Sequence, residues 1–258
     1  MSEIHSTAIV GDKVEIGENV KIGPYSIIED RVKIGDGVEI KPYVNILANT
    51  EIGPETQIFQ NAVIGEIPQD LKFKGEETRT IIGSNTTIRE SVTVNRGTKD
   101  RGKTVIGDNC LLMAYSHVAH DCLLGDSVIL ANSVGLGGHV TIEDWAILGG
   151  LVGVHQFVRI GRHSIIAGGY RVTKDVPPYI MAAEEPLSYR GLNVVGLKRR
   201  DFSSEKRRTL KKAYKKLYRA GNNVSEAKEK LENNFKDSEE VERLLEFLEN
   251  SERGIIGS

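Results

Sequence analysis

The 258-residue sequence is poor in several residue types, and each scarcity excludes a class of protein. Only two cysteines occur, which excludes a disulfide framework and fits a reducing compartment. Lys and Arg number 34 against 36 Asp and Glu, and the resulting formal charge of −2 excludes a polybasic chain. No apolar run approaches the ~18 residues of a membrane span, and the N-terminal residues MSEIHSTAIVGDK lack the apolar core of a signal peptide. We therefore expect a cytoplasmic protein with no nucleic-acid partner and no stable membrane insertion.

What the sequence does contain is a six-residue repeat that fills its first two thirds. A long aliphatic residue stands at every sixth position, in rows that run over residues 4–64, 82–94 and 106–172. Two positions before each, from Ala8 to Ser164, stands only Ala, Ser, Thr, Val or Cys, with Tyr170 as the first exception. One position after, glycine is the commonest residue. Repeats of this kind indicate a stack of small structural units.

The six-residue period differs from the 3.6-residue period of a helix and predicts a short strand followed by a bend. Three such units make a triangular coil of about 18 residues, and successive coils stack at about 4.8 Å. We expect the glycine after each aliphatic residue to adopt an unusual backbone angle. The pattern resembles the hexapeptide-repeat family, which implies a mainly β fold, a left-handed parallel β-helix.

Two interruptions of the repeat, residues 65–81 and 95–105, are polar and rich in turn-forming residues. We expect them to loop out, and long loops on a rigid scaffold often carry binding sites. Pro177 and Pro178 should end strand pairing. The predicted organisation is a β-helix over residues 1–190 followed by a small α-helical C-terminal domain over 191–258.

The C-terminal segment predicts three amphipathic helices. The first should begin after the capping residue Ser203 and end at Gly221. It lies in a basic stretch, because residues 198–219 contain 11 Lys and Arg but only Asp201 and Glu205 as acids. This stretch is either an ordinary solvated helix face or a docking site for an acidic partner.

Histidines gather along one edge of the predicted coil. His120, Gly138 and Gln156 are each separated by 18 residues, so they should form a column on consecutive coils. Three further histidines lie beside this column, namely His117, His139 and His155. A His that removes a proton from an attacking hydroxyl contributes roughly 10²–10⁴ in rate. Gly138 suits the donation of a backbone N–H to an oxyanion, because it has no Cβ to block a close approach.

The same histidine cluster permits other interpretations. His117, His120 and His139 together could form a three-histidine zinc site. Gln156 and the two long loops would serve no evident purpose in such a site, so we expect no metal and no other cofactor. The remaining alternative is a set of surface residues on a repeat scaffold. Cys110 and Cys122 fall in the small-residue row and should pack inward.

Several longer motifs occur in a characteristic order: IGEIPQDLKFKGEETR, IRESVTVNRGT, HVAHDC, GVHQF, DVPPY and GLNVVGLKRR. Together they resemble the UDP-N-acetylglucosamine acyltransferase family over essentially the whole chain. The resemblance implies transfer of a 3-hydroxyacyl group from acyl carrier protein to the glucosamine 3-position of UDP-N-acetylglucosamine, the first step of lipid A biosynthesis.

The resemblance also implies roles for individual residues. His120 would be the general base, Asp121 would orient it, and the Gly138 N–H would stabilise the oxyanion. Gly168 falls where the family sets acyl-chain length, and a glycine there leaves room for a longer chain. The residues expected to bind substrate are Asp70, Lys72, His117, His139, His155, Gln156, Asn193 and Arg199.

The family is trimeric, which implies a homotrimer with active sites between subunits and a basic helix that docks acyl carrier protein. This chain departs from the family at Val195, where many members carry a glutamate near the nucleotide, and at Tyr170 beside the expected acyl groove. The alternatives are a 3-amino UDP-sugar as acceptor, an acyl-CoA donor, and a metal-dependent hydratase.

Overall fold

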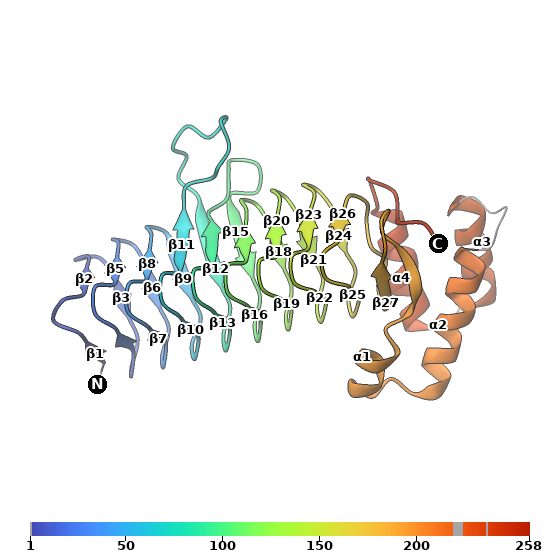
Figure 1. Ribbon diagram of the computed structural model, residues 1–258, viewed down its shortest axis with the longest axis horizontal. Helices are drawn as coiled ribbons and strands as arrows, with labels where there is room; N and C mark the ends of the chain where they lie inside the picture. The colour runs from blue at the N-terminus through green and yellow to red at the C-terminus, as the bar shows by residue number, and fades with distance from the viewer. Residues whose placement is uncertain (1, 219–223, 236) are drawn as a thin grey trace.

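The computed structural model describes residues 2–218, 224–235 and 237–258, and its main feature is a three-sided coil of short parallel strands (Figure 1). Consecutive strands belong to three different sheets, so every third strand returns to the same sheet. Ile4, for example, pairs with Ile22, and Ile129 pairs with Ile147, each 18 residues further along. The predicted fold class, a left-handed parallel β-helix of hexapeptide repeats followed by helices, is confirmed.

The strands form three faces, here named sheets A, B and C. Sheet A contains β1 (Glu3–Ile4), β4 (Lys21–Ile22), β7 (Glu39–Ile40), β10 (Gln57–Ile58), β13 (Thr87–Ile88), β16 (Leu111–Leu112), β19 (Ile129–Leu130), β22 (Ile147–Leu148), β25 (Ile165–Ile166), β27 (Ile180–Ala183) and β28 (Ser188–Leu192). Sheet B contains β2 (Ile9–Val10), β5 (Ile27–Ile28), β8 (Asn45–Ile46), β11 (Val63–Glu66), β14 (Thr93–Asn95), β17 (His117–Val118), β20 (Gly135–Leu136), β23 (Gly153–Val154) and β26 (Arg171–Val172). Sheet C contains β3 (Glu15–Ile16), β6 (Lys33–Ile34), β9 (Thr50–Ile52), β12 (Arg79–Ile82), β15 (Lys103–Ile106), β18 (Leu123–Leu124), β21 (Thr141–Ile142) and β24 (Arg159–Ile160).

The interior of the coil is filled by the predicted aliphatic row. These side chains are buried from Ile22 to Val172, whereas Ile4 in the first coil is 46% exposed. Cys110 and Cys122 are buried in the small-residue row, as predicted. Each buried Ile, Leu or Val removes apolar surface from water and stabilises the fold by roughly 1.5–3 kcal/mol. The apolar interior is therefore exposed to solvent at the N-terminal end, and the buried aliphatic row stabilises the rest of the coil along its axis.

The expected role of the glycines is wrong in one respect. Of the glycines that follow the aliphatic row, only Gly65 has a positive φ. The left-handed residue lies two positions later and is usually not glycine, as at Asn109 (φ 56°). The glycines are required for a different reason, because a Cβ on Gly107 would lie 2.6 Å from the backbone of Gly125 in the next coil. Close stacking of the coils, rather than backbone angle, accounts for them.

Strand pairing continues past the prolines, contrary to the prediction. After Pro177 and Pro178 the chain forms β27, which pairs in parallel with β25, and β28 then pairs antiparallel with β27. Strand pairing can resume because β27 lies beyond the prolines and supplies its own backbone N–H groups. This hairpin forms the last layer of sheet A.

Among the described residues four helices follow, α1 (Val194–Arg199), α2 (Ser204–Leu217), α3 (Val224–Asn234) and α4 (Glu239–Glu249). The prediction of three helices was wrong, because it did not include the short α1. Ser203 caps α2 as predicted, and its hydroxyl accepts a hydrogen bond from the N–H of Lys206. α2 ends at Leu217, and Gly221, its predicted end, lies outside the described residues. Tyr214 on α2 is buried, and its hydroxyl donates to the carbonyl of Pro178. The helices thereby cover the C-terminal end of the coil (Figure 1).

None of the helices within the described parts of the chain is both long enough and apolar enough to cross a membrane.

The three edges of the coil are named by the sheets they join: edge A–B, edge B–C and edge C–A. The two longest connections within the coil, residues 67–78 and 96–102, both pass from sheet B to sheet C, between β11 and β12 and between β14 and β15. Figure 1 shows them projecting from the same side of the coil. The loops therefore rise from edge B–C.

Candidate active site

The histidine column predicted from the 18-residue spacing lies on edge B–C, the edge that carries the loops. His120 follows β17, His139 follows β20, and His155 follows β23, so the three occupy the same corner of successive coils. Backbone hydrogen bonds join the layers, from the N–H of His139 to the carbonyl of His120 at 3.0 Å and from the N–H of Phe157 to the carbonyl of Gly138 at 3.0 Å. The parallel ladder therefore sets the spacing of the candidate site.

The centre of this cluster is a hydrogen-bonded pair. Nδ1 of His120 lies 2.8 Å from Oδ2 of Asp121. The Asp121 side chain is fully buried, whereas the imidazole is 14% exposed. An ionised carboxylate can only accept, so Nδ1 carries a proton, and the lone pair of the neutral imidazole is then on Nε2. This is the arrangement of a histidine base held by a carboxylate.

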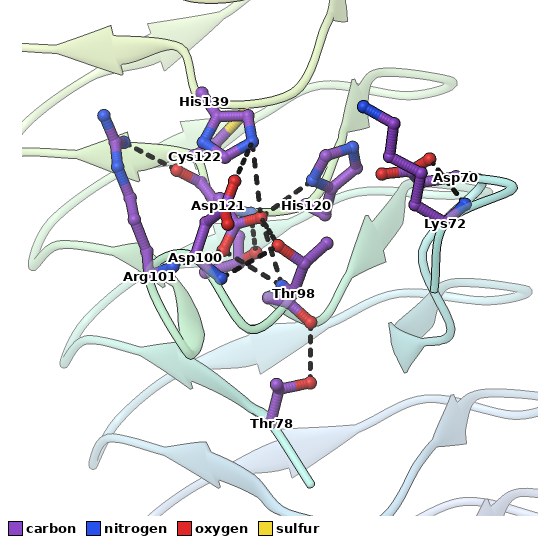
Figure 2. A network of polar contacts seen from close by, with 12 residues as sticks. Asp70, Lys72, Thr78, Thr98, Asp100, Arg101, His120, Asp121, Cys122 and His139 are labelled. Atoms are coloured by element: carbon purple, nitrogen blue, oxygen red, sulfur yellow. Dashed lines mark hydrogen bonds and ion pairs between the residues drawn. The ribbon is translucent and has the colours of Figure 1, made fainter. Parts of the chain in front are cut away.

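The second loop surrounds the Asp121 carboxylate with donors (Figure 2). The hydroxyl of Thr98 donates to Oδ2 at 2.7 Å, the N–H of Thr98 donates at 3.0 Å and 3.1 Å, and the N–H of Arg101 donates to Oδ1 at 3.3 Å. Burial by itself raises the pKa of this carboxyl, but the hydrogen bonds from His120 and Thr98 outweigh it and lower the pKa. Asp121 is therefore ionised although buried.

His139 packs against this pair. Its ring meets that of His120 edge-on with centroids 5.2 Å apart and stacks on Phe157 at 4.5 Å. Its Nε2 lies 3.7 Å from a carboxylate oxygen of Asp121 and 3.7 Å from one of Asp100. Burial lowers the pKa of His139, and the Asp121 carboxylate opposes that shift. At pH 7 the ring is therefore mainly neutral.

His117 lies on β17, on the outer side of sheet B. Its Nδ1 is 2.8 Å from the hydroxyl of Thr93 on the neighbouring β14. Burial, with a smaller contribution from nearby His120, lowers the pKa of His117. A neutral imidazole at this position can donate or accept a hydrogen bond but adds no positive charge.

Gly138 lies directly against the candidate base. A Cβ on this residue would be 2.6 Å from Cε1 and 2.7 Å from Nε2 of His120, so any side chain would cover the Nε2 lone pair. Among the described residues no acceptor takes the Gly138 N–H. At the corresponding place on edge C–A, the carboxylate of Asp126 accepts the N–H of Asp108 from the preceding coil. Gly138 therefore combines an open approach with an available donor.

The other predicted residues of this edge lie around the pair. Asp70 and Lys72 are on the first loop, where the N–H of Lys72 donates to Oδ1 of Asp70 at 2.9 Å. In the view of Figure 2 they lie beyond His120, on the side away from Arg101. His155 and Gln156 are exposed further along the edge, with His155 Nδ1 3.0 Å from the Gln156 carbonyl.

Three predicted residues lie elsewhere in the chain. Gly168 is on edge A–B, between β25 and β26. Asn193 caps α1, where its Oδ1 accepts the N–H of Gly196 at 3.1 Å and its Nδ2 donates to the carbonyl of His163 at 2.9 Å. Arg199 is exposed in the last turn of the same helix. His163 belongs to edge C–A, so one chain does not bring these three residues to His120.

The residues that hold the His120–Asp121 pair in place were not predicted from the sequence. Thr98, Arg101 and Asp100 all come from the second loop, and Arg101 also donates through its guanidinium to the Asp121 carbonyl at 2.7 Å. The polar character of that loop indicated a binding segment. The 18-residue period could not predict these contacts, because Thr98 and Asp121 are 23 residues apart.

The arrangement does not match the three-histidine zinc alternative. Potential ligand atoms of His120, Asp121 and His139 do lie within 4.8 Å of one another, but His117 is outside this group. The Asp121 oxygens already accept hydrogen bonds from Thr98, Arg101 and His120. A metal would have to displace these donors, so the donor set fits a hydrogen-bonded base better than a tetrahedral zinc site.

The repeat and its site define a hexapeptide-repeat transferase, and comparison with known proteins agrees. A family model described as bacterial transferase hexapeptide (six repeats) matches residues 103–138, and one described as Udp N-acetylglucosamine O-acyltransferase, domain 2, matches residues 175–256. A model of the GMPPB C-terminal domain matches residues 4–108.

Relatives that match the chain over its full length identify the family within this class of transferases. A protein of Thiobacillus denitrificans named acyl-[acyl-carrier-protein]–UDP-N-acetylglucosamine O-acyltransferase is 50% identical over 99% of this chain and 100% of its own length. The solved UDP-N-acetylglucosamine acyltransferase of Bacteroides fragilis superposes with a TM-score of 0.96 at 47% identity, covering 98% of this chain and 99% of that one. The enzyme of Francisella novicida gives 0.97 at 42%, with 99% and 94% covered. The chain belongs to the UDP-N-acetylglucosamine acyltransferase family.

The titration of His139 tests the electrostatics of the site. Because burial disfavours the imidazolium, its NMR titration midpoint should fall below the ordinary value of about 6.5. Asp121→Asn removes a negative charge that favours the imidazolium, so the midpoint should fall further. Asp100→Asn, the matched control, removes a weaker influence and should cause a smaller decrease. A wild-type midpoint at or above 6.5, or a rise in Asp121→Asn, would contradict this description.

Proposed function

We propose that this protein transfers a 3-hydroxyacyl chain from acyl carrier protein to the 3-position of UDP-N-acetylglucosamine, the first step of lipid A biosynthesis. The observation that carries the proposal is the His120–Asp121 pair beside the available N–H of Gly138. The names of full-length relatives point to the same donor and acceptor. A base next to an oxyanion donor is what acyl transfer to a hydroxyl requires.

The chemistry proceeds through a tetrahedral intermediate. The sugar 3-hydroxyl attacks the thioester carbonyl carbon while Nε2 of His120 takes its proton. The carbonyl oxygen becomes an oxyanion that accepts the Gly138 N–H, and Asp121 stabilises the imidazolium that forms. The intermediate then collapses with cleavage of the C–S bond, and the leaving thiolate takes the proton from His120. An ester and free carrier-protein thiol result, and His120 returns to its starting state.

The acceptor is held by the residues around the pair on edge B–C. Lys72 carries a positive charge on an exposed loop and suits a phosphate, while Asp70 suits a sugar hydroxyl. The neutral imidazoles of His117 and His139 can each donate one hydrogen bond to and accept one from uncharged sugar groups. The proposed acceptor-binding residues on this edge are Asp70, Lys72, His117, His139, His155 and Gln156.

A homotrimer with active sites between subunits would complete this site. Gly168 lies on edge A–B, and Asn193 and Arg199 lie at α1, so their proposed roles require a neighbouring copy of the chain to bring them to His120. Edge A–B, which carries Gly168, also exposes large apolar side chains at the same corner position of several coils, namely Tyr25, Tyr43, Tyr115 and Leu151, which suit a protein contact. Packing edge A–B of one copy near edge B–C of the next closes a ring of three.

The basic helix α2 is the proposed docking site for the acidic carrier protein. A cavity of about 960 Å³ opens beside it, with Tyr189, Tyr218 and Phe235 as apolar lining. Four lysines of α2 also line this cavity: Lys211, Lys212, Lys215 and Lys216. A positively charged rim around an apolar floor is complementary to an acidic helix with an apolar side chain on its surface.

Activity with defined substrates tests the reaction. Purified protein should acylate UDP-N-acetylglucosamine from a 3-hydroxyacyl carrier protein. A panel of chain lengths should show a preference for a long chain, because a glycine at position 168, the proposed length-setting residue, would leave room for one. Light scattering should give three times the chain mass of 28.4 kDa. Product only with the 3-amino UDP-sugar, or only with acyl-CoA donors, would replace the proposed substrate. Absence of product with every pair would refute acyl transfer.

The base is tested by His120→Ala. Removing it should lower kcat by roughly 10²–10⁴, the contribution of a general base, while the trimer stays folded because this side chain lies at a corner of the coil, outside the apolar core. His5→Ala, in the first coil and exposed, is the control and should keep wild-type turnover. Near wild-type activity in His120→Ala would exclude this residue as the base.

Charge reversal on α2 tests carrier-protein docking. The double variant Lys211→Glu/Lys215→Glu should raise KM for the acyl carrier protein by about tenfold, within the range of electrostatic steering, and leave KM for the sugar nucleotide unchanged. Lys13→Glu/Lys21→Glu makes the same charge change at the other end of the coil and should have no effect on either KM. An equal rise in KM for the acyl carrier protein in the two double variants would show that the net charge of the protein, rather than the α2 surface, determines carrier-protein binding.

A further inference from the structure

The two inserted loops are joined to each other and to the His120–Asp121 pair by one hydrogen-bond network (Figure 2). Thr78, at the end of the first loop, donates its hydroxyl to the carbonyl of Gly97 at 2.6 Å. The next residue, Thr98, donates to Asp121, and Asp121 accepts Nδ1 of His120. The loop that carries Asp70 and Lys72 is therefore linked to the imidazole through four residues, all of them in the described part of the chain.

Thr98 is the loop residue of this network that reaches the carboxylate with a side chain. Its hydroxyl and Nδ1 of His120 both donate to the same oxygen, Oδ2, at 2.7 Å and 2.8 Å. The backbone N–H groups of Thr98 and Arg101 also donate to this carboxylate, so rotation of Asp121 would disturb the hydrogen bonds of four donors, two of them from Thr98. The threonine therefore determines which way the carboxylate faces.

Thr98 is itself held on every side. Only 7% of the residue is exposed. Its carbonyl accepts the N–H of Gly102 at 2.8 Å, and its hydroxyl accepts the N–H of Asp100 at 3.2 Å. The preceding residue must be glycine, since a Cβ on Gly97 would lie 2.2 Å from the backbone nitrogen of Lys103. The loop thus presents the Thr98 hydroxyl in one orientation, with its proton pointing to Asp121.

We propose that Thr98 is a positioning residue for the proposed acyl transfer: it holds Asp121 so that His120 keeps its proton on Nδ1 and its lone pair on Nε2. The inference rests on the proposed function for its kinetic consequence only. The hydrogen-bonded state of His120 can be measured without substrate. Thr78, one step further along the network, contributes to the same positioning through Gly97.

The test compares Thr98→Val, which keeps the shape but removes the hydroxyl, with Thr98→Ser, which restores it. In Thr98→Val we expect kcat to fall about 10-fold to 100-fold, less than the roughly 10²–10⁴ of the base itself, with KM for UDP-N-acetylglucosamine changed less than twofold. In substrate-free protein labelled with ¹⁵N-histidine, the deshielded Nδ1 proton of His120, assigned with His120→Ala, should broaden or disappear. Thr98→Ser should recover both kcat and the Nδ1 proton signal of His120. Thr78→Val should lower kcat less than Thr98→Val does.

A matched control exists in the neighbouring strand. Thr80 on β12 is also fully buried, but its hydroxyl has no hydrogen-bond partner among the described residues, so Thr80→Val should keep wild-type kcat and the Nδ1 signal. An unchanged Nδ1 signal and kcat in Thr98→Val would overturn the proposal. Equal losses in Thr98→Val and Thr98→Ser, with a matching fall in Tm, would also overturn it in favour of a purely structural role. Inactivity of the wild type with every substrate would refute the function, while the Nδ1 signals would still decide the role of Thr98.

Discussion

The constraint on which the whole structure depends is the parallel hydrogen-bond ladder between coils. Each strand is only a few residues long and would be unstable alone, but its backbone groups bond to the strands before and after it in the same sheet. The aliphatic row gives every coil the same cross-section, and the glycines of the next row allow the coils to approach closely. Any side chain at a corner therefore has a fixed neighbour in the next coil, which is how a repeat can position a site.

The corner geometry also explains how two adjacent residues form the candidate base. Side chains of consecutive strand residues point to opposite faces and cannot reach each other. Asp121 leaves the strand geometry with φ 59°, a conformation that Asp tolerates better than most residues, and its carboxylate meets Nδ1 of His120. His139 occupies the equivalent position one coil later with φ 63°. The left-handed corner that the coil needs at every turn is thus also what assembles the cluster.

A contact of the fold or of the candidate site could be predicted from the sequence only where it follows the 18-residue period of the coil. The β-helix and the edge shared by His120, Gly138 and Gln156 follow from spacing alone, because no insertion interrupts residues 106–172. Across the loops the pairing distance changes, to 30 residues for Gln57 and Thr87, and the period no longer predicts neighbours. Thr98 and Arg101 reach Asp121 through loop conformation, which has no period. The proposed site roles of Gly168, Asn193 and Arg199 depend on a second copy of the chain, whose position no single-chain pattern specifies.

The loops have a physical role that the coil alone cannot fill. A carboxylate placed in the corner of an uncovered coil would be solvated and free to rotate, and it would hold the imidazole only weakly. Burying it removes water but costs free energy unless each oxygen finds donors. The second loop does both, since it covers Asp121 completely and supplies the Thr98 and Arg101 donors, while the first loop is bonded to the second through Thr78. Of the pair, only the imidazole stays accessible, so at the proposed site a substrate would meet Nε2 of His120, backed by a fixed and ionised carboxylate.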